Sequence, residues 1–87
     1  MNKETELSII NVCYMCVSSK FAAYCNPANR GPNFDWKNFP NDMADDASYW
    51  IWSNGIDRYD NDNLAKEVAT EIAKQLIIRA GFIEETV

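Results

Sequence analysis

Residues 63–80, NLAKEVATEIAKQLIIRA, carry the clearest helical pattern in this 87-residue chain. Because residues four positions apart lie on one side of an α-helix, repeats at that step mark its buried face. Gly81 follows where helices commonly end in left-handed backbone. We therefore predict a scaffold helix over 63–80 with two apolar rows: Leu64, Val68, Ile72 and Leu76, beside Ala65, Ala69, Ala73 and Ala80.

A second helix is predicted to begin near Thr5, as its N-cap, and to end before Pro27, because the residue before a proline is pushed out of helical geometry. Residues 9–17, IINVCYMCV, are also rich in β-branched and aromatic side chains, which favours a strand there as the alternative. The predicted core stripe steps by three and four and is widened by Ile9, Cys13 and Cys16: Leu7, Ile10, Tyr14, Val17, Phe21 and Tyr24.

Residues 42–53 predict a third helix, with Asp42 as N-cap and Asn54-Gly55 as its end. At about 100° per residue, one side of this helix is apolar and the other combines acids with large rings. The apolar side consists of Met43, Ala47, Trp50 and Ile51, and the opposite side of Asp42, Asp45, Tyr49 and Trp52.

The remaining long stretch, residues 27–40, reads PANRGPNFDWKNFP and holds all 3 prolines of the chain. We predict an irregular loop whose Phe34, Trp36 and Phe39 rings fold back onto the helices. At this length the chain forms one small acidic domain over 1–87. The predicted fold is mostly α: a compact three-helix domain with a long aromatic irregular loop between helices 1 and 2, and α+β with a small sheet as the alternative.

Negative charge is concentrated in residues 35–62, where seven aspartates stand against Lys37 and Arg58. The acids and bases outside this segment cancel, so the segment carries the whole net charge of −5. A field of one sign repels DNA and RNA and attracts basic surfaces. The charge pattern therefore predicts a protein partner with a basic surface and no direct contact with nucleic acid.

Several kinds of chemistry are disfavoured by the residues that the chain lacks. It has no histidine, no glycine-rich phosphate loop and no fourth cysteine to complete a zinc site beside Cys13, Cys16 and Cys25. Residues 57–63, DRYDNDN, fail the EF-hand pattern, although a calcium site of another kind over Asp57–Asp62 stays open. We predict that the protein is not an enzyme, needs no cofactor, and keeps its cysteines reduced, buried and inert.

The predicted working surface is an acidic aromatic face that engages a partner. The alternative is that the loop around Trp36 covers the rings of Tyr49 and Trp52, which would remove the anchors of this face. The predicted function is a non-enzymatic inhibitor or modulator. A carbohydrate or small-ligand module and a homo-oligomeric assembly subunit are the alternatives. The predicted partner-binding residues are Trp36, Asp42, Asp45, Asp46, Tyr49, Trp52, Asp57 and Asp60.

In size, acidity and lack of catalytic residues, the chain resembles small virus-encoded or plasmid-encoded inhibitors of bacterial defence nucleases, and also bacteriocin immunity proteins and antitoxins. The resemblance is one of type and not of a shared motif, so it assigns no residues. It implies a phage-type inhibitor first, with an immunity protein or antitoxin as the alternative. The N-terminal apolar run looks too short and too polar to span a membrane, so we expect a cytoplasmic protein, in the host cytoplasm if virus-encoded.

Overall fold

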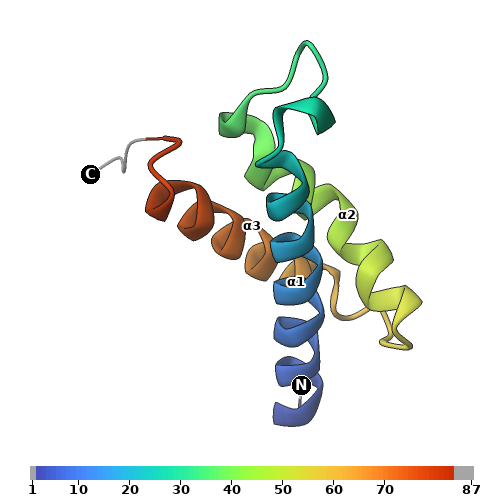
Figure 1. Ribbon diagram of the computed structural model, residues 1–87. Coiled ribbons are helices and arrows are strands. Elements are labelled where there is room, and N and C mark those ends of the chain that lie inside the picture. Colours follow the sequence, from blue (N-terminus) through green and yellow to red (C-terminus); the bar gives the residue numbers. More distant parts are fainter. Residues whose placement is uncertain (1, 84–87) are drawn as a thin grey trace.

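The computed structural model describes residues 2–83 and contains three α-helices, α1 (Lys3–Tyr24), α2 (Phe39–Ser53) and α3 (Asp62–Arg79) (Figure 1). Two short 3-10 turns, η1 (Pro27–Asn29) and η2 (Trp36–Asn38), punctuate the segment between α1 and α2. Residues 9–17 lie inside α1, and the described part of the chain contains no strand. The prediction of a mostly α, three-helix domain is confirmed.

The starts of α1 and α2 differ from the prediction. Asn2, and not Thr5, caps α1: its side-chain oxygen accepts a hydrogen bond from the Thr5 N–H at 2.7 Å. α2 begins at Phe39, so Asp42 lies in its first turn instead of capping it. Pro40 suits that turn because it lacks an N–H and has a helical φ.

The ends of the helices follow local signals more closely. α1 stops at Tyr24, before Pro27, and α2 stops at Ser53, where Gly55 takes a φ of 81°. α3 starts at Asp62, one residue earlier than predicted, after a polar turn. Asn61 occupies the N-cap position, but its side chain donates to the Asp57 carbonyl at 2.6 Å and makes no cap bond.

The core stripe of α2 is confirmed, since Met43, Ala47, Trp50 and Ile51 are all buried. The stripe of α1 is wrong in part: Ile9, Cys13 and Val17 are fully buried, whereas three members of the predicted stripe are exposed, namely Leu7, Ile10 and Tyr14. The partner helices cover only one of the apolar sides of α1, and periodicity alone does not say which side that is.

α3 meets the other helices through its alanines. Ala65, Ala69, Ala73 and Ile77 are fully buried, while the row of larger side chains that starts at Leu64 is only half-buried beside the core. Small side chains allow the helix backbones to approach closely, and Cys13 of α1 donates its thiol hydrogen to the Ala65 carbonyl across this contact, at 3.7 Å. Burial raises the pKa of the Cys13 thiol to about 11, with Cys16 adding to the shift. The expectation of buried cysteines holds for Cys13, but Cys25 is exposed.

An aromatic cluster closes one end of the molecule, as predicted for the loop rings. Trp36 lies 5.4 Å from Phe21, 4.8 Å from Phe34 and 5.3 Å from Phe39, measured between ring centroids. Phe82, just after α3, stacks on Trp36. The cluster therefore holds the loop between α1 and α2 against the C-terminal end of α3.

The three helices form a flat molecule, with Cα extents of 38 × 30 × 16 Å. α2 and α3 pack most extensively against each other, and α1 crosses in front of them in Figure 1, with its N-terminal part projecting beyond both. Among the residues that the structure describes, α1 is the one helix long and apolar enough, by length and composition, to cross a membrane. This corrects the expectation that the N-terminal run is too short, although a core helix or a signal sequence passes the same test.

Candidate protein-binding face

The outer side of α2 brings together most of the predicted partner-binding residues. Because α2 is a regular helix, its members of this set, at positions 42, 45, 46, 49 and 52, fall within an arc of about 120°. All of them are exposed, while the opposite side of the helix is buried in the core. We call the following residues the acidic aromatic face: Asp42, Asp45, Asp46, Tyr49 and Trp52 of α2, with Asp57 and Asp60 of the turn that follows.

The two rings of this face form a pair on the surface. Tyr49 is 61% exposed and Trp52 is 56% exposed, and their ring centroids lie 5.9 Å apart. The guanidinium carbon of Arg58 stands 5.8 Å from the Trp52 centroid, within the range of a cation–π contact. Trp36 packs in the aromatic cluster at the other end of α2. The loop around Trp36 therefore does not cover the rings of Tyr49 and Trp52.

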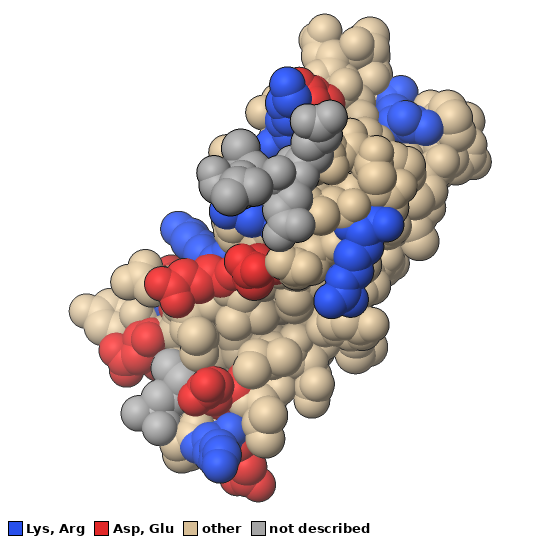
Figure 2. Space-filling view, turned by 90° about the vertical axis from the view of Figure 1, so that its left-hand side faces the viewer, with Lys and Arg blue, Asp and Glu red and all other residues tan. Residues whose placement is uncertain are grey.

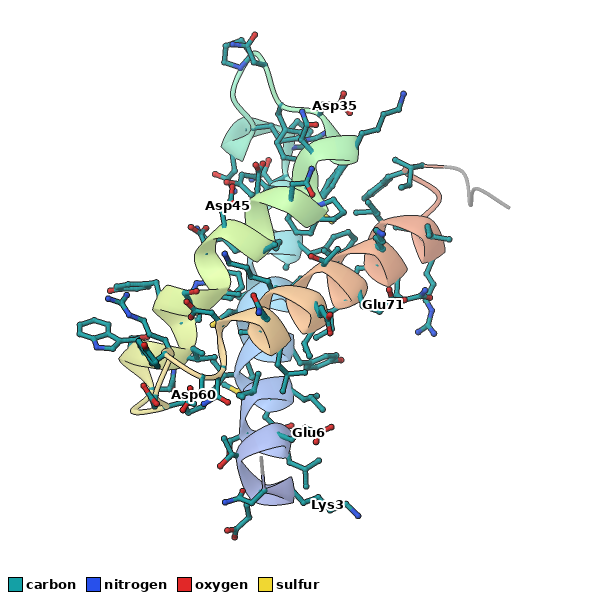
Figure 3. All side chains as sticks on the ribbon, turned by 180° about the vertical axis from the view of Figure 1, so that it is seen from behind. Lys3, Glu6, Asp35, Asp45, Asp60 and Glu71 are labelled. Carbon is teal, nitrogen blue, oxygen red and sulfur yellow. The ribbon has the colours of Figure 1, made fainter. Side chains whose placement is uncertain are left out.

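Trp36 is thus the one predicted partner-binding residue that lies apart from the others. Its indole is half-buried among Phe21, Phe34, Phe39 and Phe82, and these contacts give it a structural role. Figure 3 shows Asp45 and Asp60 on one side of the molecule and Glu71 of α3 on the other. The acidic aromatic face therefore occupies the α2 side of the fold.

Sequence reasoning missed Tyr59, which is 89% exposed and lies in the same turn as Asp57 and Asp60. The turn is ordered locally, because the Asp57 side-chain oxygen accepts a hydrogen bond from the Tyr59 N–H at 3.0 Å. The available signal was a tyrosine between two aspartates, in a segment that the sequence analysis considered only as a possible calcium site. Tyr59 extends the apolar contact area of the face beyond the end of α2.

An open cavity of about 420 Å³ lies beside the turn, between it and the N-terminal end of α1. Its lining is mainly polar and includes Glu4, Asp57 and Asn61. No group of three or more His, Cys, Asp or Glu side chains within residues 2–83 is arranged to hold a metal ion. The calcium site considered for Asp57–Asp62 therefore gains no support from such a group.

A search against protein-family models finds no match, and no curated protein or solved structure matches the chain either. The function must therefore be argued from the physical properties of the face itself.

Proposed function

We propose that the protein is a non-enzymatic inhibitor or modulator that engages a basic surface of a protein partner through the acidic aromatic face. One observation carries the proposal: Tyr49 and Trp52 stay more than half exposed on the same side of α2 as Asp42, Asp45 and Asp46. Solvated helix faces usually carry polar side chains, and exposed rings are the residues that most often anchor protein interfaces.

The charges support a partner that ordinarily binds nucleic acid. Asp42, Asp45 and Asp46 project from successive turns of a helix, and Asp57 and Asp60 continue the negative charge past its end. Carboxylates spaced along a rigid element can meet the lysines and arginines that otherwise contact phosphates. A nuclease of a bacterial defence system, captured in the cytoplasm, is the partner class that we propose. An immunity protein or antitoxin uses the same chemistry toward a different enzyme.

A pull-down from bacterial lysate tests the proposal with a matched control. The test variant carries Asp42→Lys, Asp45→Lys and Trp52→Ala, which removes two acids and one anchor from the face. The control variant carries Glu6→Lys and Met15→Ala on α1 and Glu67→Lys on α3. It makes the same change of charge and removes one exposed apolar side chain, away from the acidic aromatic face. Both variants should remain folded, because every substituted side chain is exposed.

We expect wild type and control to capture a nucleic-acid enzyme at low salt, to release it at high salt, and to inhibit it. The test variant should lose capture and inhibition together, and Trp52→Ala alone should weaken binding by at least about tenfold. Capture that survives high salt, or equal capture by test and control variants, would contradict a charge-driven face. Binding of a soluble carbohydrate with little dependence on salt would instead favour the ligand-module alternative.

A further inference from the structure

A polar cleft separates the turn before α3 from the N-terminal end of α1. It consists of two cavities of about 420 Å³ each, which share Thr5 and Asn61 in their walls. We call the two cavities together the turn cleft. Its walls include Asn2, Glu4 and Thr5 at the start of α1, and Asp57, Asp60 and Asn61 of the turn.

Asn61 gives the turn cleft a hydrogen-bond acceptor that is already held in place. Its side chain is 7% exposed, and its amide nitrogen donates to the Asp57 carbonyl. An asparagine at an N-cap position ordinarily uses its oxygen to accept a bond from the first turn of the helix, but Asn61 makes no such bond. No N–H or O–H group within residues 2–83 donates to this oxygen. A ligand N–H in the cleft would therefore satisfy an acceptor that the fold leaves without a partner.

Negative charge decides the class of ligand. Glu4, Asp57 and Asp60 line the turn cleft, and no Lys or Arg of the described chain does. α1 and α3 begin beside the cleft, and each helix N-terminus acts as about half a positive charge. The two termini together offset about one of the three carboxylates, so the cleft favours a cation. Figure 2 shows a different arrangement on the side of the molecule away from α2, where Lys and Arg side chains are interspersed with the acids.

The arrangement of the acceptors favours an organic cation over a metal ion. The described chain offers no group of three acids arranged around a metal, and the acceptors of the cleft stand instead on two separate segments, α1 and the turn. A guanidinium group carries five N–H donors around the edge of a plane, so it can reach acceptors on both walls at once. An ammonium group is more compact and more strongly hydrated, so it gains less in an open cleft.

We propose that the turn cleft binds a guanidinium group. The carboxylates supply the charge, and the Asn61 Oδ1 accepts one of the N–H groups. The guanidinium belongs to an arginine of the protein partner, and this assignment of its source rests on the proposed function. Asp57 and Asp60 belong both to the cleft and to the acidic aromatic face, so one partner can occupy the two together.

Titration of the isotope-labelled full chain with N-acetyl-arginine amide, followed by amide NMR, tests the site directly. The Asn61 side-chain amide and the Gly55 N–H should shift and saturate, with a dissociation constant of about 1 mM. N-acetyl-citrulline amide has the same shape without the charge and should bind at least about tenfold more weakly. The Gln75 side-chain amide on α3 is the internal reference. No saturable shift at Asn61, an equal shift at Gln75, or equal binding of the two probes would overturn the site.

Removal of single charges locates the binding. Asp57→Asn and Glu4→Gln keep the size of the side chain, and Asp57→Asn keeps an oxygen that can accept from the Tyr59 N–H. Each should raise the dissociation constant of the arginine probe by about fivefold. Glu71→Gln removes the same charge from α3 and should leave the constant within about twofold of wild type. All three side chains are exposed, so the fold should persist. Equal effects of the three variants would contradict a site in the cleft.

The pull-down described above identifies the source of the guanidinium. Glu4 lies outside the acidic aromatic face, so Glu4→Gln should weaken capture of the partner only if the cleft takes part, by about the same factor as in the titration. Unchanged capture would show that the guanidinium does not come from the partner. The titration needs no partner, so a cleft that fails to bind the arginine probe overturns this inference and leaves the proposed function standing.

Discussion

The Trp36 indole stacks on the Phe82 ring, with centroids 4.8 Å apart and planes inclined by 22°. This contact joins the loop after α1 to the turn after α3. Trp36→Ala should lower the free energy of unfolding by about 2 kcal/mol, because it removes the hub of a partly buried ring cluster.

Trp52→Ala is the matched control for that change, since Trp52 is 56% exposed and lies on the acidic aromatic face. It should cost less than about 1 kcal/mol. Urea unfolding followed by circular dichroism measures both variants. Equal losses of stability would mean that the cluster does not hold the loop.

Ala69 of α3 is fully buried where the helices pack closely. Ala69→Leu adds volume with no space to receive it and should destabilise the fold by about 3 kcal/mol. Ala80→Leu makes the same change at an exposed position and should have little effect. Thermal unfolding of the two variants compares them directly, and a stable Ala69→Leu protein would show that α3 does not pack through its alanines.

Gly55 ends α2 with a φ of 81°, and a Cβ built there meets no atom within 4 Å. Gly55→Ala should therefore destabilise the protein by about 1 kcal/mol through backbone strain alone. Gly31 has equally open space but no positive φ, so Gly31→Ala should leave the stability unchanged or slightly raised. Denaturant midpoints of the pair separate strain from packing, and equal midpoints would contradict the left-handed turn.

Burial of Cys13 links stability to pH. The pKa of the thiol rises from 9.0 to about 11 in the folded protein, so the folded state binds the proton more tightly than the unfolded chain does. The stabilisation is complete below pH 9 and is lost as the pH rises through about 11. Urea titrations at pH 8, 9, 10 and 11 should show a steeper loss for wild type than for Cys13→Ala. Parallel losses would place the thiol in water.

Much of the fold follows from local patterns, and α2 shows why. One apolar stripe and the Asn54-Gly55 stop made its faces and its end predictable, and the exposure of Tyr49 and Trp52 followed from that stripe. The predicted start of α2 lies too far along the chain, because Asp42 matched a capping pattern. In the structure Pro40, which lacks an N–H, already occupies the first turn of the helix.

Tertiary choices were harder to predict. α1 has apolar side chains around much of its circumference, so periodicity could not decide between the Ile9 side, which is buried, and the Leu7 side, which is exposed. On α3, hydrophobicity favoured the row of larger side chains that starts at Leu64 over the alanines as the buried face. Hydrophobicity scales do not register how closely two helices approach. Trp36 also stacks on Phe82, a contact between distant parts of the chain that no local signal encodes.

The same aromatic cluster sets an order for folding. Phe21 and Phe82 meet with ring centroids 5.9 Å apart, although 61 positions separate them along the chain. Closing so long a loop costs more entropy than pairing α2 with α3, which are neighbours in sequence. We expect the α2–α3 hairpin to form first and the ring cluster last, so unfolding begins where the C-terminal end of α1 meets the segment after α3.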